Sequence, residues 1–225
     1  MKVTRRRAAQ VQDVEDASGV VRKQLATDTS AVVAAAVADH YRVSVPYQGQ
    51  QTNWWCGPAS ARMILNFMGH TVSAANSASP FTQAELASSR YLRTDSNSPK
   101  ATNWGAGDYP RGFNKWYNRG ATPKFITQVN TPTLDKFKGA LAAKIPANQP
   151  FAIGTFEPAG SPHYNGHPVS QPVYHWIVVD GWKDNRATTY FRDPASTVWA
   201  GTDPTGIHST SAMVNYMKPS FGMAL

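Results

Sequence analysis

The sequence predicts an α+β fold, and two observations carry this prediction. Between Cys56 and Ile145, apolar residues recur at the three- and four-residue spacing of helices that bury one face. After Pro150 the pattern changes to short apolar runs separated by turn residues, which is typical of strands. Helices followed by antiparallel strands make an α+β domain, and a cleft between the two parts is the expected place for a site.

A short strand and a helix are expected on either side of the segment that leads to Cys56. Residues 41–47 alternate in polarity like an edge strand, which Pro46 would end. A helix is expected from Cys56, because Pro58 fits its first turn and Gly69 fits its C-terminal end. The apolar stripe of this helix comprises Ala59, Met63, Ile64, Phe67 and Met68.

Further helices and strands follow downstream, with recognisable start signals. Thr82 and Glu85 have the spacing of a capping box, which predicts a helix beginning there. Two longer helices are expected, from Asp108 to Gly120 and, after Thr133, over 134–145. The later segments are strands at 151–156, 174–179 and 188–192, a short strand from Val198, and a last helix at 211–217.

A change of composition near His40 predicts a domain boundary. Residues 1–40 contain no Trp, Phe, Tyr or Pro, so they offer little to a core. We expect them to be a pro-segment or tether, and residues 41–225 to be one folded domain. The apolar run Ala31–Ala38 is expected to form a short helix, because the polar residues before it do not fit a signal peptide.

The charge distribution argues against a nucleic-acid partner. The net charge is +8, but four of the 22 cations lie in the first seven residues, which leaves 18 cations against 14 anions. No basic cluster follows. No apolar run approaches the ~20 residues of a membrane helix. Few charges and many Trp suggest a secreted or cell-surface bacterial protein, with a cytoplasmic location left open, and we expect a monomer.

Cys56 is the single cysteine, which excludes an internal disulfide and a multi-thiolate zinc site. It stands at the expected start of a helix, where backbone N–H groups and the helix dipole favour a thiolate. Gly57 after it would let a substrate carbonyl approach the backbone. A buried structural cysteine remains the alternative at this stage.

His175 is the histidine best placed to serve Cys56. It opens a strand that is otherwise apolar, where an unpartnered ring would be costly. His163 and His167 lie in a loop with Gly and Pro, so we expect them to be solvated rather than metal ligands. His70 is expected at the surface, and His208 lies in a late stretch of Gly, Thr and Ser. A satisfied core histidine is the alternative interpretation of His175.

Asp193 and Gln50 complete the pattern. Asp193 ends the next strand, and a hairpin of this length would bring it beside His175, where a carboxylate can orient the ring. A turn-forming role before Pro194 is the alternative. Gln50 lies six residues before Cys56 and could supply an amide donor to an oxyanion hole, with Gln48 and Gln51 as competing candidates.

Gln-x5-Cys-Gly-Pro-Ala-Ser, His-Trp-Ile-Val-Val-x-Gly-Trp and Phe-x-Asp-Pro together resemble a papain-like cysteine peptidase of the bacteriocin-leader-peptidase-like type. The resemblance covers roughly residues 43–200. It implies a papain-like catalytic domain at 41–225 with Gln50 in the oxyanion hole, Cys56 as nucleophile, His175 as base and Asp193 as orienting carboxylate. It implies a peptide or protein substrate, with no cofactor and no metal.

Three points stay open. The same acyl-enzyme could serve transpeptidation, deamidation or acyl transfer instead of hydrolysis, and a non-catalytic peptide-binding module is a further alternative. Substrate contacts are assigned to Trp55, Gly57 and Trp176, next to the nucleophile and base. No acidic specificity pocket is evident, with Glu157 as the one candidate, and the long insert between the first and fourth helices leaves the substrate unidentified.

Overall fold

The structure is a computed structural model that describes residues 11–15, 21–25, 39–217 and 221–225. The chain divides into two units, residues 1–37 and 38–225. In the first unit, β1 (Val11–Glu15) and β2 (Val21–Leu25) pair as an antiparallel hairpin. The helix expected at Ala31–Ala38 lies outside the described residues, and the role of residues 1–40 stays a prediction.

The second unit contains an antiparallel sheet of seven strands. Its order is β4-β9-β5-β6-β7-β8, and β3 pairs separately with β6. The strands are β3 (Tyr41–Arg42), β4 (Gln128–Asn130), β5 (Phe151–Glu157), β6 (Val173–Lys183), β7 (Thr188–Arg192), β8 (Thr205–Ser209) and β9 (Gly222–Ala224). The long strand β6 lies between β5 and β7, so a residue on it has neighbours on both sides.

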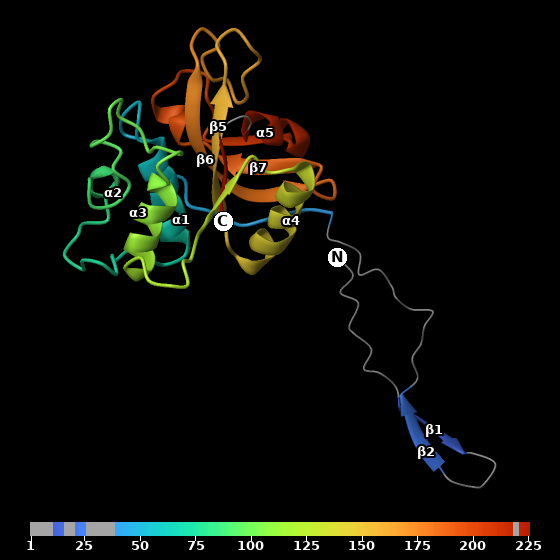
Figure 1. The fold of residues 1–225 in the computed structure, drawn as a ribbon. Coiled ribbons are helices and arrows are strands. Elements are labelled where there is room, and N and C mark those ends of the chain that lie inside the picture. Colours follow the sequence, from blue (N-terminus) through green and yellow to red (C-terminus); the bar gives the residue numbers. More distant parts are fainter. Residues whose placement is uncertain (1–10, 16–20, 26–38, 218–220) are drawn as a thin grey trace. The chain divides into compact units, whose positions relative to one another are not determined.

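Helices lie on both sides of the central strands. They are α1 (Cys56–Phe67), α2 (Gln83–Ala87), α3 (Asp108–Asn118), α4 (Leu134–Lys144) and α5 (Thr210–Met217), with short 3-10 turns η1 (Ile145–Ala147) and η2 (Pro194–Thr197). Helices α1, α2 and α3 gather on one side of β5 and β6, and α4 and α5 on the other (Figure 1). α1 packs against β6 and α5 against β5. The predicted α+β class is confirmed.

The sequence signals for helix starts are confirmed at two positions. Thr82 Oγ1 accepts a hydrogen bond from the backbone N–H of Glu85 (3.1 Å), and Thr133 Oγ1 accepts one from Lys136 (3.3 Å). Each side chain thereby satisfies one of the N–H groups that the first helical turn leaves free. At the end of α1, Gly69 adopts a positive φ of 75°, as a helix-terminating glycine should.

Three expectations about strands were wrong or incomplete. The strand expected over 41–47 is only two residues long, although the Val43 N–H still donates to Asp180 O (2.8 Å). No strand begins at Val198, because its N–H closes the η2 turn on Ala195 O, and the next strand starts at Thr205. β4 and β9 were missed, since three residues are too short for a periodic pattern.

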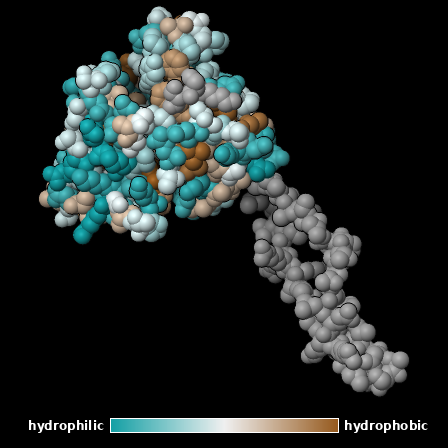
Figure 2. All heavy atoms as spheres, viewed as in Figure 1, coloured by the Kyte–Doolittle hydropathy of each residue, from teal (hydrophilic) through white to brown (hydrophobic). Residues whose placement is uncertain are grey.

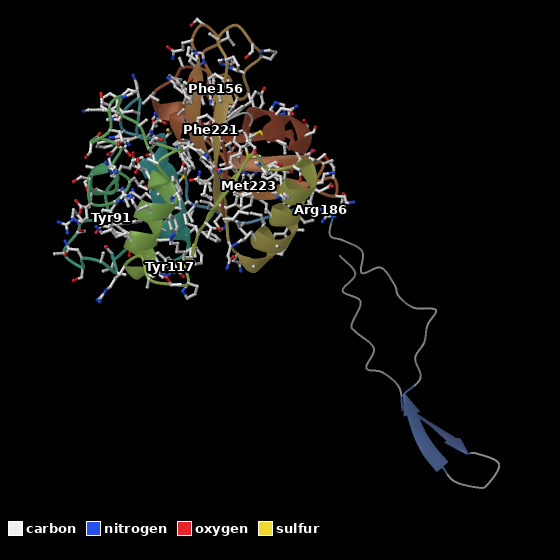
Figure 3. All side chains as sticks on the ribbon, viewed as in Figure 1. Tyr91, Tyr117, Phe156, Arg186, Phe221 and Met223 are labelled. Atoms are coloured by element: carbon white, nitrogen blue, oxygen red, sulfur yellow. The ribbon has the colours of Figure 1, made fainter. Side chains whose placement is uncertain are left out.

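The core joins the helical part to the sheet. Trp176 of β6 stacks on Tyr109 of α3 with ring centroids 4.3 Å apart. Tyr91 and Tyr117 lie among the helical side chains, whereas Phe156 lies at the far end of β5 (Figure 3). The face seen in Figure 2 is mainly hydrophilic with scattered apolar spots. Among the described residues, no helix is long and apolar enough to cross a membrane.

Candidate active site

Cys56 is the first residue of α1 and is 8% exposed. The indole N–H groups of Trp54 and Trp55 both donate to Asp95 Oδ1, at 2.9 and 2.8 Å, and so fix the turn that leads into the helix. The thiol therefore sits where the helix presents unpaired N–H groups and its positive dipole end. This is the position that the sequence predicted for a nucleophile.

Gly57 is required at its position by close packing. A Cβ atom there would lie 2.1 Å from Thr102 Oγ1. Trp176, the other predicted substrate contact in this area, is buried and donates its indole N–H to Thr102 O (3.1 Å). Both placements favour a packing role beneath Cys56. Trp55 is half-buried and remains a candidate for contact with substrate.

His175 connects Cys56 with Asp193. It lies on β6 opposite Thr155 of β5, and its Nε2 donates to Asp193 Oδ1 at 2.7 Å. Its Nδ1 does not contact Asp193 and is left for the Cys56 side chain, which lies close enough to influence the pKa of the ring. Burial alone would lower the pKa of His175, but the charge and hydrogen bond of Asp193, followed by those of Cys56, raise it to about 10. The ring is thus held as an imidazolium.

Asp193 accepts four hydrogen bonds. Oδ1 accepts from His175 and from the Ala195 N–H (2.9 Å), so the residue also caps η2. Oδ2 accepts from His167 Nε2 (2.7 Å) and Asn165 Nδ2 (2.8 Å). Burial alone would raise the pKa of Asp193, but the charge of His175 and the hydrogen bonds from both histidines hold it well below its usual range. Asp193 therefore contacts the His175 ring and also caps the η2 turn.

The expectation that His167 is a solvated loop residue was wrong. It is 3% exposed and bridges Asp193 to Glu157, with Nδ1 2.6 Å from Glu157 Oε2. The loop between β5 and β6 folds back over the sheet because Glu157 Oε1 also accepts from the Tyr164 N–H (2.7 Å). Glu157 is itself fully buried, so it does not form an open acidic specificity pocket.

Sequence reasoning missed His167 and Trp199 as neighbours of His175, and Asn165 as a neighbour of Asp193. The Trp199 ring centroid lies 5.4 Å from that of His175 and 5.0 Å from that of His167, so it covers both imidazoles. One available signal was Glu157 at the end of an apolar strand, because a buried carboxylate requires a polar partner.

Gln50 is buried and lies against the turn after Asp193. Its backbone N–H donates to Pro194 O (2.8 Å), and its side-chain Nε2 donates to Thr52 O (2.8 Å), which leaves one amide hydrogen. The competing glutamines are placed differently. Gln48 accepts from Arg62, and Gln51 is exposed.

His167, His175 and Asp193 are close enough together to be considered as metal ligands, with ligand atoms within 4.8 Å of one another. These atoms are joined by direct hydrogen bonds of 2.7 Å, which a metal would have to displace. The arrangement fits a hydrogen-bonded network better than a metal centre. The expectation of no metal stays a prediction.

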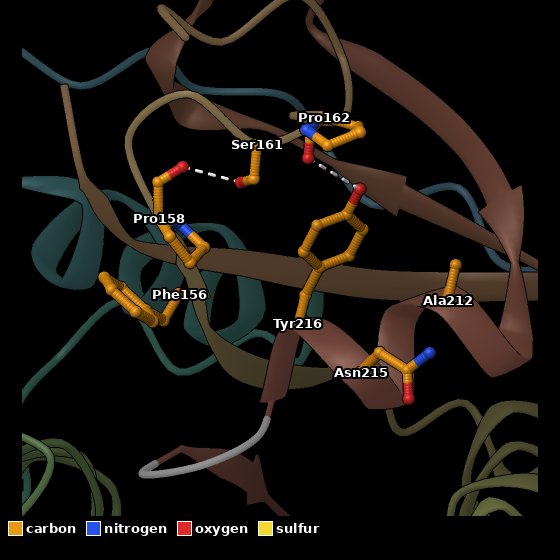
Figure 4. Close-up of a pocket in the computed structure, with 7 residues that line it drawn as sticks. All are labelled: Phe156, Pro158, Ser161, Pro162, Ala212, Asn215 and Tyr216. Atoms are coloured by element: carbon orange, nitrogen blue, oxygen red, sulfur yellow. Dashed lines mark hydrogen bonds between the residues drawn. The ribbon is translucent and has the colours of Figure 1, made fainter. Parts of the chain in front are cut away.

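A surface cavity of about 360 Å³ lies apart from these residues. It is formed between the β5–β6 loop and α5, with Phe156, Pro158 and Tyr216 among its lining residues (Figure 4). Ser161 Oγ donates to Pro158 O at 2.6 Å, and the Tyr216 hydroxyl donates to Pro162 O at 3.3 Å. None of the predicted site residues lines this cavity.

Comparisons with known proteins find a similar solved structure and a matching family. The chain is similar in structure to xylellain, a cysteine protease from Xylella fastidiosa, at 13% identity and a TM-score of 0.41, over 84% of this chain and 87% of that one. No curated protein matches the sequence. Residues 42–214 match the Peptidase_C39 like family, which confirms the resemblance seen in the sequence. The chain therefore belongs to the Peptidase_C39 like family and is a cysteine peptidase.

Proposed function

We propose that the protein hydrolyses peptide bonds through an acyl-enzyme on Cys56, with His175 as acid and base and Asp193 as its orienting group. The observation that carries this proposal is the placement of His175. One ring nitrogen is 2.7 Å from Asp193 Oδ1, and the other is left for the thiol at the head of α1. A thiolate beside an imidazolium is the activated pair that thiol peptidases use.

The first chemical step forms the acyl-enzyme. The Cys56 sulfur attacks the substrate carbonyl carbon, and the electron pair of the C=O bond moves to oxygen. When the tetrahedral intermediate collapses, the C–N bond breaks and the His175 imidazolium gives its proton to the leaving amine. The neutral ring then takes a proton from water, which attacks the thioester and releases the acid.

An oxyanion hole is part of the proposal. The Cys56 N–H at the head of α1 has no partner four residues earlier in the helix. The spare amide hydrogen of Gln50 is the second candidate donor, because Gln48 and Gln51 are engaged or exposed. Two donors directed at the developing negative charge would lower the barrier to attack.

The main test replaces the nucleophile. We expect Cys56→Ala to abolish turnover on a peptide panel while the melting temperature stays close to wild type, since the side chain changes by one atom. Cys56→Ser should retain little activity, because a hydroxyl is much less ionised than a thiol near neutral pH. Asn66→Ala on the same helix is the matched control. Full turnover by Cys56→Ala would contradict the proposal.

Two further measurements separate the alternatives. Because Cys56 is the only thiol, one equivalent of iodoacetamide labelling reports its reactivity directly. An unreactive thiol would favour a non-catalytic binding module. Product masses separate hydrolysis, which adds water, from transpeptidation, which adds an amine. Deamidation would change a substrate side chain without cutting the backbone.

A further inference from the structure

Both ring nitrogens of His167 face carboxylate oxygens. Nδ1 lies 2.6 Å from Glu157 Oε2 and Nε2 lies 2.7 Å from Asp193 Oδ2, and all three side chains are fully buried. An ionised carboxylate only accepts hydrogen bonds, so each nitrogen must carry a hydrogen. A neutral imidazole carries only one. The geometry therefore requires His167 to be an imidazolium when both carboxylates are ionised.

The β5–β6 loop is built to hold this ring. Glu157 is anchored from its other oxygen by the Tyr164 N–H, and the His167 N–H closes a turn on Tyr164 O (3.2 Å). Asn165, within the same turn, gives Asp193 its second side-chain donor on Oδ2 (2.8 Å). One loop thus delivers two donors to the oxygen of Asp193 that does not contact His175.

We propose that His167 is a positioning residue of this site: a buried imidazolium, fixed by Glu157, that sets the orientation of Asp193 and limits the negative charge that Asp193 presents to His175. This inference rests on the proposed function of Cys56 and His175. His167 does not reach the reacting atoms, and it acts through Asp193 alone. The proposed roles of Cys56, His175 and Asp193 do not by themselves require His167.

The charged and titratable groups around His167 are few. The carboxylates of Glu157 and Asp193 face its two nitrogens, and the His175 imidazolium is its neighbour with ring centroids 5.0 Å apart. The rings of Tyr164 and Trp199 cover its remaining faces at 4.6 and 5.0 Å. Burial lowers the pKa of His167, but the hydrogen bonds to Asp193 and Glu157 raise it above its usual value.

The charge on His167 has a predictable effect on His175. Two imidazoliums that share Asp193 repel each other, so His167 makes the charged form of His175 less stable than Asp193 alone would. Neutralising His167 therefore raises the pKa of His175. The His175 ring then stays protonated to higher pH, while the looser Asp193 slows the acid–base steps.

The test compares Glu157→Gln and His167→Gln with wild type. Glu157→Gln leaves the His167 ring in place but removes the anion that keeps it doubly protonated. We expect the pH at which the His175 ring loses its proton, followed by nitrogen-15 spectra, to rise by about one pH unit in both variants. Peptide turnover should show a kcat loss of about tenfold with little change in KM. His163→Gln, in the same loop but bonded only to Pro158 O, is the matched control and should match wild type.

An unchanged His175 titration in a folded Glu157→Gln protein would overturn the proposal. Should both variants fail to fold, the wild-type protein still decides it. Nitrogen-15 spectra should show two protonated ring nitrogens for His167 at pH 8, and a single protonated nitrogen would refute the imidazolium. The His175 titration needs no substrate. Failure of peptide hydrolysis would therefore contradict the proposed function, while the titration would still decide this inference on its own.

Discussion

Two fully buried carboxylates, Asp180 on β6 and Asp193 at the end of the neighbouring β7, have opposite environments. Asp180 on β6 accepts from two arginines, Arg42 at 3.1 Å and Arg192 at 2.7 Å, and both contacts use Oδ2. Among the described residues, its Oδ1 has no hydrogen-bond partner. Asp193, just beyond β7, uses both oxygens and accepts four hydrogen bonds.

The two sites stabilise negative charge to different degrees. Burial raises the pKa of Asp180 more than the partly exposed arginines lower it, so its pKa ends above the usual value. At Asp193 the two histidines and two further donors outweigh burial, and the pKa falls. A nearby positive charge is therefore not sufficient to keep a buried carboxylate ionised. The number of hydrogen bonds that its oxygens accept also matters.

The largest effect is expected for Asp193→Asn. Each carboxylate oxygen of Asp193 accepts two hydrogen bonds. An asparagine has only one accepting oxygen, so its NH₂ group would face donors instead of an acceptor. We expect peptide turnover to fall by about 10²-fold, less than for Cys56→Ala or a change at His175. The free energy of unfolding should fall by about 2 kcal/mol. Turnover kinetics and urea unfolding measure the two effects.

Asp193→Asn also tests the assignment of the orienting carboxylate. Asp180 is five residues from His175, and its side-chain hydrogen bonds among the described residues go to Arg42 and Arg192. If the change at Asp193 were harmless and the same change at Asp180 damaged activity, the assignment would have to be reversed.

The two carboxylates should change the stability of the protein in opposite directions as the pH falls. A lowered carboxyl pKa contributes stability above the unfolded-state value near 3.8, and this contribution disappears as the pH falls below it. The stability difference between wild type and Asp193→Asn should therefore shrink below about pH 4. A raised pKa has the opposite effect. The free energy of unfolding of wild type should therefore increase relative to that of Asp180→Asn as the pH falls.

His175 extends this test to alkaline pH. Its pKa is raised from 6.5 to about 10, so its contribution to stability is complete below about pH 6.5 and is lost as the pH rises towards 10. Urea unfolding from pH 6 to 10 should show the decline in wild type and a flatter profile in His175→Gln. Parallel profiles would contradict the charged state of His175.

Local signals in the sequence predicted the parts of the site that depend on local structure. Cys56 follows from the helix start at Pro58, and the pairing of His175 with Asp193 follows from the length of the β6–β7 hairpin. These features depend on capping, periodicity and strand register, which neighbouring residues determine. The α+β class followed from the same signals.

The network behind Asp193 could not be predicted in this way. His167 meets partners ten and 26 residues away through an irregular loop, and only the folded backbone shows that the loop turns inward. Asn165 adopts a positive φ of 53° there, a conformation that the sequence does not specify. Gly166 lies so close to Gly201 O that a Cβ would be 2.2 Å away, which is a tertiary constraint without a periodic signal.

The smallest effect is expected for Asp180→Asn, although this carboxylate is as buried as Asp193. The amide oxygen can take over both arginine contacts on Oδ2, and the NH₂ group would occupy the position of the unpartnered Oδ1. Because burial disfavours the charged carboxylate and raises the pKa of Asp180, we expect removing the charge to cost little. We expect a change in unfolding free energy within about 0.5 kcal/mol and unchanged turnover. Arg42 and Arg192 retain contact with solvent, so neither is left as a buried unpaired charge. A loss as large as that of Asp193→Asn would show that the arginine pair stabilises the charge, and the contrast between the two carboxylates would fail.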